Sequence, residues 1–143
     1  MVKKREIIYC ENKRDFKGVV LEELLKMFAE TGVIKIKTTK LNADRIALSE
    51  SSDVISCRII NILIKGKANF KQVLPAEGKI IRPLYLFLDR EILLYARLRR
   101  LKFRAIKEKK DKISSFIDEL ENKHPEIKHS IVKGYLELAD ESI

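Results

Sequence analysis

The sequence predicts an α/β fold, a partial Rossmann-like parallel sheet flanked by helices, with a helical C-terminal part. Short runs rich in β-branched residues at 33–37, 45–48 and 79–82 alternate with helical patterns, which is typical of a parallel sheet. Beyond about residue 101 only helical patterns follow. The length of 143 residues fits one domain spanning 1–143. We expect an α/β part up to about residue 101 and a basic, helical part over 102–143.

The first half of the chain predicts one helix and two strands. Asp15 is suited to cap a helix because its carboxylate can accept hydrogen bonds from the first turn. Apolar residues then recur at helical spacing over 16–28, and Gly32 supplies the C-terminal cap. Residues 33–37 alternate as a strand and residues 45–48 form a second one. These two could pair as a hairpin, although the loop exceeds the favoured two residues.

A second helix and a further strand follow. Polar residues 49–53 open the helix, whose apolar side runs over 54–64 and which ends at a Lys-Gly pair. Residues 67–78 are predicted to form a loop. Residues 79–82 are a strand that ends at Pro83, since proline cannot donate to a sheet.

Three more helices are predicted in the remainder. Asp89 is expected to cap the first of them, which runs to about Leu101. The second covers 112–122, and the third starts at Pro125, a favoured residue in a first helical turn. The few short strands make an incomplete sheet, because a parallel sheet needs both faces covered. We therefore expect a partner, either another subunit or a second copy.

The formal charge of +9 is concentrated in one segment. Residues 97–112 hold nine basic and two acidic residues, and such a positive field attracts phosphate backbones. The alternative is a solvated helix face in a Lys-rich proteome. The predicted RNA-binding residues are Arg97, Arg99, Arg100, Lys102, Arg104, Lys107, Lys109 and Lys110.

Within this segment, helical spacing predicts that Arg97, Arg100 and Arg104 share one face, which is the main site prediction. Tyr85, Tyr95 and Phe103 interleave aromatic rings with the basic residues, which suits base stacking, although Tyr95 can equally belong to the core.

Other functional classes find little support. No apolar run approaches the roughly 20 residues that span a bilayer, so we expect no membrane association and a cytoplasmic location. Cys10 and Cys57 need not be paired there. His124 and His129 are too few for a zinc site, which needs four ligands, so no metal is expected.

Residues 42–66 carry a resemblance to a known family. They read N-A-D-R-I-A-L-S-E-S-S-D-V-I-S-C-R-I-I-N-I-L-I-K-G. This is similar to the second nucleotide-contacting segment of the PP-loop ATP pyrophosphatases that thiolate tRNA, whose fold is of the PP-loop or HUP type. Their pattern there is roughly G-A-D-K-[IL]-x-T-G-H-N-x-D-D, followed by R-G. Asp53 falls on the first Asp of the D-D pair, Val54 replaces the second, and Ser49-Glu50-Ser51 replaces G-H-N.

Three further segments resemble the same family in the correct order. Residues 81–101 contain R-P-L, then E-I-L-L-Y-A and a final Leu, like the family's R-P-L…E-[IV]-x-x-Y-A…L. Residues 116–131 resemble its F-L-x-x-L-E-x-x-[HR]-P-x-I-x-x-S-[IV] tail. Residues 9–14 resemble its C-x-x-C-G-x-x-R entry, with Ile7 in place of the first Cys.

The departures from the family remove its chemistry. The S-G-G-x-D-S loop that cradles the pyrophosphate of ATP is absent, and by this alignment so is the strand before it. The cysteine pair that holds a cluster or carries sulfur is reduced to Cys10, and the terminal zinc-binding cysteines are missing. No cofactor is therefore expected. Asp53 remains a weak candidate for Mg²⁺ with ATP, beside the simpler role of helix N-cap. Cys10 remains a weak catalytic candidate, beside the simpler role of an inert cysteine after an apolar strand.

The resemblance is closest to the non-catalytic type of subunit in the two-subunit cytosolic tRNA 2-thiolase. It implies that the chain is no enzyme alone, binds tRNA and supports thiolation of the wobble uridine. Implied partners are a catalytic PP-loop thiolase subunit or a second copy, and a ubiquitin-like sulfur donor acting through the complex. Two alternatives stay open: a basic RNA- or DNA-binding module without a thiolase link, and a self-sufficient enzyme that uses Cys10.

Overall fold

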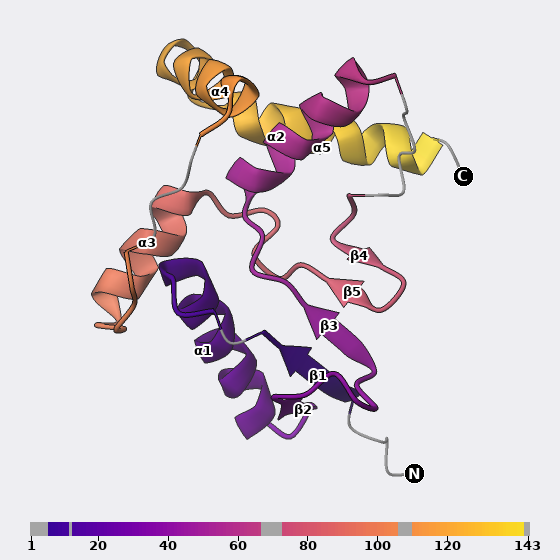
Figure 1. Cartoon of the computed structure of the whole chain (residues 1–143), viewed down its shortest axis with the longest axis vertical. Helices are drawn as coiled ribbons and strands as arrows, with labels where there is room; N and C mark the ends of the chain where they lie inside the picture. The colour runs from indigo at the N-terminus through magenta and orange to yellow at the C-terminus, as the bar shows by residue number, and fades with distance from the viewer. Residues whose placement is uncertain (1–5, 12, 67–72, 106–109, 142–143) are drawn as a thin grey trace.

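The computed structural model describes residues 6–11, 13–66, 73–105 and 110–141. Five strands and five helices lie within them (Figure 1). In chain order they are β1 (Glu6–Cys10), α1 (Phe16–Glu30), β2 (Ile34–Lys37), β3 (Arg45–Ala47), α2 (Ser52–Ile64), β4 (Ala76–Glu77), β5 (Ile80–Ile81), α3 (Asp89–Leu98), α4 (Lys112–Lys123) and α5 (Ile127–Glu141). No helix among the described residues is long and apolar enough to cross a membrane.

The strands form one sheet in the order β2-β1-β3-β5-β4. The first four are parallel, and β4 joins β5 as a short antiparallel edge inside the predicted 67–78 loop. The predicted hairpin between 33–37 and 45–48 is wrong, because β1 lies between these strands and pairs with both. The reason lies in β1 itself: its apolar run Ile7-Ile8-Tyr9 suits a central strand, whereas β2 carries lysines and lies at the edge.

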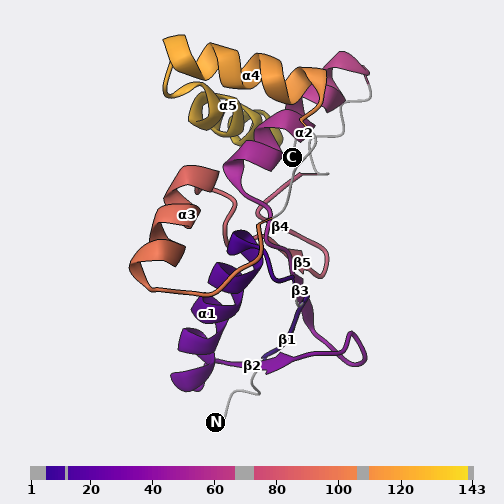
Figure 2. The ribbon, with the colours of Figure 1, turned by 60° about the vertical axis from the view of Figure 1, so that its left-hand side comes forward.

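Helix α1 begins and ends where the sequence predicts. The Asp15 carboxylate accepts a hydrogen bond from the Gly18 N–H at 2.7 Å, which satisfies one free donor of the first turn. Gly32 adopts φ 82° just after the helix, a conformation that glycine takes without steric cost. Helices α1 and α3 lie on the same face of the sheet (Figure 2). The core there includes Ile8, Leu21 and Ile92.

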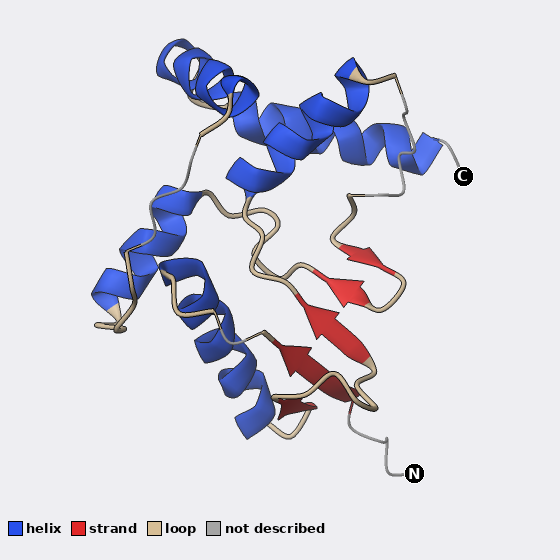
Figure 3. Ribbon diagram, viewed as in Figure 1, coloured by secondary structure: helices blue, strands red, loops and turns tan. Residues whose placement is uncertain are grey.

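Helices α2, α4 and α5 form a second packed group beyond the carboxyl ends of the strands (Figure 3). Its core contains Ile55, Ile59, Tyr85, Val132 and Tyr135, all buried. This group joins the sheet through the segments that connect β3 to α2 and β5 to α3. The two predicted helices are confirmed as α4 and α5: α4 ends one residue later than predicted, and α5 starts two residues after Pro125.

Helix α3 ends earlier than predicted, at Leu98 instead of about Leu101. Arg100 takes φ 55°, and the Leu101 N–H returns to the Ala96 carbonyl at 2.9 Å, which closes the helix end. The chain then runs back without helical structure, and the Arg104 N–H donates to the Arg14 carbonyl at 2.7 Å. An arginine in the left-handed region gives no sequence signal comparable to a glycine.

Candidate functional site

The sheet has a switch point between β1 and β3. The connection from β1 passes through α1 to β2 on one side, whereas β3 leads through α2 toward β5 on the other. Ligands of open α/β sheets bind outside the carboxyl ends of the strands at such a point. The apolar strand predicted before Cys10 is confirmed as β1, which is followed by the N-terminus of α1.

The backbone of Lys13, in the turn between β1 and α1, packs directly against the first turn of α1. A Cβ atom built on Gly18 would lie 2.2 Å from the Lys13 carbonyl oxygen, so this backbone rests directly on the first turn of α1. The Asp15 carboxylate already accepts the Gly18 N–H. Phosphate cradles need free N–H groups at such a helix end. An anion here would have to displace both the Asp15 carboxylate and the Lys13 carbonyl.

Asp89 fills the space between the N-termini of α1, α2 and α3. Its carboxylate accepts a hydrogen bond from the Ser51 hydroxyl and lies 3.6 Å from the Lys17 ammonium, which is buried. The Asp89 N–H donates to the Asp53 carboxylate at 2.8 Å. A carboxylate of the protein thus stands at the helix ends where an anionic ligand is favoured.

Asp53 joins three helices instead of capping one. Ser51 is the N-cap of α2, and Asp53 lies two residues later in the first turn. Likewise Leu88, not Asp89, precedes α3. These two cap predictions are wrong, because both carboxylates point away from their own helix ends to partners elsewhere. The Asp53 carboxylate accepts hydrogen bonds from the Asp89 N–H and from the Lys128 ammonium of α5.

Lys128 is buried at the centre of a carboxylate cluster. Its ammonium contacts Asp53, Asp118 at 2.9 Å and Glu121 at 3.5 Å. Burial by itself would lower the pKa of Lys128, but hydrogen bonds to Asp53 and Asp118 outweigh burial and raise that pKa above its usual range. Burial would also raise the pKa of Asp118, but hydrogen bonds from Lys110 and Lys128 hold it below its usual range.

A polar pocket of about 340 Å³ opens beside this cluster, between α2 and α4. Its lining includes Asp53, Cys57, Arg58, Lys110 and Asp118. The cations in this wall are paired: Arg58 with Glu50, and Lys110 with Asp118 at 2.7 Å. The positive charges around the pocket are therefore balanced by carboxylates of the protein itself.

The predicted weak catalytic candidate, Cys10, ends β1 at the switch point but is only 7% exposed. Burial raises the pKa of its thiol, and the charges of Glu22 and Glu11 raise it further. This is the opposite of the environment that activates a cysteine. Cys57 is half-buried, and its pKa is raised by burial and by Asp111. The described residues contain no group of three side chains that could hold a metal ion.

The predicted basic face is wrong as a helix face. Arg97 lies on α3, Arg100 lies in the left-handed turn after it, and Arg104 lies in the non-helical segment that returns to α1. All three are exposed, and none pairs with a carboxylate in the described part of the chain. The other predicted RNA-binding residues differ in their exposure and in their ion pairs. Lys102 is exposed, Arg99 pairs with Glu23 at 3.0 Å, Lys110 pairs with Asp118, and Lys107 and Lys109 lie outside the described residues.

The aromatic residues of this segment serve packing. Tyr85 is buried, and its hydroxyl donates to the Val73 carbonyl at 2.7 Å. The Phe103 ring lies edge-on to Phe16 with centroids 6.2 Å apart. Tyr95 is half-buried against the core of α1 and α3. The predicted stacking set is therefore wrong for Tyr85, whose ring is inaccessible.

Two residues of the site, Lys17 and Lys128, were not predicted from the sequence. Both are buried lysines that lie opposite carboxylates from distant segments. A signal for Lys128 existed, since it falls on the same helical stripe as the buried Val132 and Tyr135. A charge on an apolar stripe indicates a buried ion pair. Its partners could not be read from the sequence.

No protein-family model and no curated protein matches this chain. Its structure is similar to that of the U34-tRNA thiolase NcsA from Methanococcus maripaludis, solved with its [4Fe-4S] cluster. The TM-score is 0.71 at 18% sequence identity, over 96% of this chain and 73% of the thiolase chain. Likeness at this identity establishes a shared fold. The predicted α/β fold, a parallel sheet flanked by helices, is therefore confirmed, and this thiolase shares it.

Proposed function

We propose that the chain is a non-catalytic tRNA-binding subunit that assembles with a catalytic PP-loop thiolase for 2-thiolation of the wobble uridine. The fold it shares with a tRNA thiolase supports this proposal, together with family-like segments that occur in the correct order. The observation that carries the non-catalytic role is the closed switch point. Lys13, Asp15 and Asp89 occupy the helix N-termini where this kind of fold takes a phosphate.

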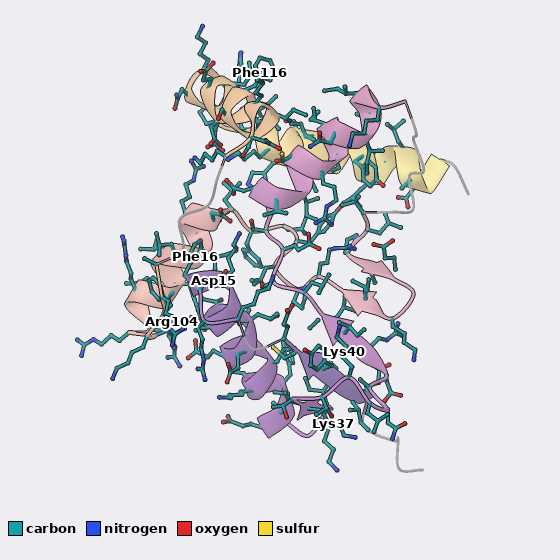
Figure 4. All side chains as sticks on the ribbon, in the orientation of Figure 1. Asp15, Phe16, Lys37, Lys40, Arg104 and Phe116 are labelled. Atoms are coloured by element: carbon teal, nitrogen blue, oxygen red, sulfur yellow. The ribbon has the colours of Figure 1, made fainter. Side chains whose placement is uncertain are left out.

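The tRNA contact is assigned to the exposed basic side chains after α3. Arg97, Arg100, Lys102 and Arg104 lie within eight residues and are all exposed. The Arg104 backbone is tied to Arg14, so the segment is held beside α1 (Figure 4). Exposed arginines without carboxylate partners are available to phosphate oxygens. Affinity that rests on such contacts falls steeply with salt.

Charge reversal tests this surface. The variant Arg97→Glu, Arg100→Glu, Arg104→Glu should weaken binding of a tRNA transcript at least about tenfold in fluorescence anisotropy at 100 mM salt. It should also reduce the slope of log Kd against log salt by about 2–3, since each phosphate contact contributes roughly 0.9. A matched reversal of exposed lysines Lys112, Lys123 and Lys133 on α4 and α5 is the control. If the two variants have equal tRNA affinities and equal salt slopes, the proposed tRNA-binding surface is refuted.

Assembly requires a separate experiment. Mixing the chain with a purified catalytic PP-loop thiolase subunit should give a stoichiometric complex in size-exclusion chromatography with light scattering. The complex should raise the yield of 2-thiouridine in tRNA above that of the catalytic subunit alone. Binding of tRNA without any complex would instead favour a stand-alone RNA- or DNA-binding module. Thiouridine formation by this chain alone, abolished in Cys10→Ser, would favour a self-sufficient enzyme.

A further inference from the structure

One face of the sheet has no helix over it in the described part of the chain. Helices α1 and α3 both lie on the opposite face, and in Figure 2 the described chain on this side consists of the loop between β2 and β3 and the turn between β4 and β5. The pleat places Ile7, Tyr9, Ile46 and Ile80 on this face, because their alternating neighbours Ile8, Cys10 and Ala47 belong to the buried core. These four side chains are half-buried.

The same face is strongly basic along its β2 edge. Lys35 is in register with Ile7, and Lys37 with Tyr9, so both lysines point to the open side. Lys40 follows in the next loop, and its ammonium lies 5.7 Å from the centre of the Tyr9 ring. Residues 33–41 contain these three lysines and no acidic residue.

These lysines are not neutralised by the protein. None of Lys35, Lys37 and Lys40 pairs with a carboxylate among the described residues. Two carboxylates lie near this face: Glu77, at the far edge, pairs with Arg82 at 2.7 Å, and Asp44, just before β3, accepts the Ile7 N–H at 2.8 Å. Figure 4 shows Lys37 and Lys40 at the foot of the sheet, away from Arg104 beside α3. The sheet lysines therefore form a basic surface separate from the arginines.

We propose that this open sheet face binds an unpaired stretch of RNA. A base can stack on the Tyr9 ring once Lys40 swings from it to a phosphate, and Ile46 and Ile80 extend the apolar floor beneath the next base. Lys35 and Lys37 lie about 6.5 Å apart along one strand, in position for successive backbone phosphates. An aromatic ring with Lys37 in register beside it and Lys40 over it, neither paired with a carboxylate among the described residues, suits a flexible polyanion. The uneven charge disfavours a second copy, which would place like charges face to face.

The inference is independent of the thiolase assignment and concerns different residues from the proposed tRNA surface. Its first test is anisotropy with a fluorescein-labelled uridine decamer, which has no duplex. The variant Lys35→Gln, Lys37→Gln, Lys40→Gln should weaken binding at least about tenfold and reduce the salt slope by about 2, at roughly 0.7 per contact for single strands. Arg97→Gln, Arg100→Gln, Arg104→Gln serves as the matched control and should retain most of the affinity for the decamer.

Tyr9→Leu tests stacking separately from charge. It keeps apolar bulk on the face but removes the ring, so decamer affinity should fall at least about fivefold with the salt slope unchanged. Ultraviolet cross-linking of the wild type should place the RNA on the peptide that contains Tyr9. Thermal melting of each variant checks that it is folded.

Three outcomes would overturn the inference. One is unchanged decamer affinity in the lysine variant. Another is a cross-link that maps to residues 97–104 instead of β1. The third is a dimer of the wild type that Tyr9→Leu dissociates, because the open face would then be covered by a second copy. If the lysine variant behaves as expected while the Arg97, Arg100 and Arg104 reversal leaves tRNA binding unchanged, only the proposed tRNA surface fails.

Discussion

Replacing Gly18 by alanine should destabilise the protein, although the same change normally strengthens a helix. A Cβ atom at this position would lie 2.2 Å from the Lys13 carbonyl oxygen and 2.8 Å from the Lys13 carbonyl carbon. Both are backbone atoms, so the turn before α1 would have to move by about 1.2 Å to bring the 2.2 Å approach to an ordinary van der Waals contact of 3.4 Å. That turn is held at its other side, because the Arg14 carbonyl accepts the Arg104 N–H at 2.7 Å.

The magnitude follows from two opposing effects. Overpacking of this kind costs about 1–3 kcal/mol or more, whereas glycine to alanine within a helix contributes about 0.5–1 kcal/mol of stability. We expect the free energy of unfolding of Gly18→Ala to fall by about 1–3 kcal/mol, since its first-turn position limits the helical gain. The melting temperature should drop by about 2–4 °C for each kcal/mol.

Gly134 provides the matched control. It lies inside α5, and a Cβ atom there would meet no atom within 4 Å. Gly134→Ala should therefore stabilise the protein by about 0.5–1 kcal/mol. Both variants are measured by urea unfolding followed by circular dichroism. If Gly18→Ala is as stable as the wild type while Gly134→Ala gains stability, the Lys13 backbone does not rest on α1 and the closed turn is refuted.

Two further predictions concern the buried ionisable groups. Lys128→Met should lower the free energy of unfolding by about 3 kcal/mol at pH 7, the lower end for a broken buried pair, because its carboxylate partners keep 20–30% exposure. The pKa of Asp118 is held below its usual range, so its contribution is complete above about pH 4 and is lost as pH falls through the folded pKa. Urea unfolding at pH 7 and at pH 2.5 measures the free energy of unfolding of wild type and variant, and the difference between the two proteins should be smaller at pH 2.5. An equal difference at the two pH values would contradict this. Burial raises the pKa of Cys10, so iodoacetamide should modify it at least about tenfold more slowly in the native protein than in urea. Peptide mass spectrometry measures this, and equal rates in the two states would contradict a closed environment.

Much of the fold could be predicted because its signals are local. The Asp15 cap, the glycine after α1 and the apolar spacing of α2, α4 and α5 each depend on residues a few positions apart. The alternation of strands and helices indicated a parallel sheet, which the structure confirms. The predicted pairing of β2 with β3 was wrong because strand order depends on how strands far apart in the sequence compare: the apolar β1 takes the centre and the lysine-bearing β2 takes the edge.

The candidate site could be predicted only in part. The sequence indicated that no glycine-rich phosphate loop is present and that positive charge gathers after α3. It could not show that Asp89 and Lys17 meet at the helix N-termini, or that Lys128 reaches Asp53 across 75 residues. These contacts form between segments that only the packed helices bring together.

The sequence by itself determined the class of fold, most helix boundaries and the excess of positive charge, because propensity, capping and composition act along the chain. The tertiary structure alone decided which lysines and arginines are paired with carboxylates and which are left exposed to bind a ligand. It buried Lys17 and Lys128 against carboxylates, left Arg97, Arg100 and Arg104 exposed although they do not share one helix face, and left Lys35 and Lys37 on an open sheet. Whether a charge is paired depends on partners distant in sequence, and their positions exist only after folding.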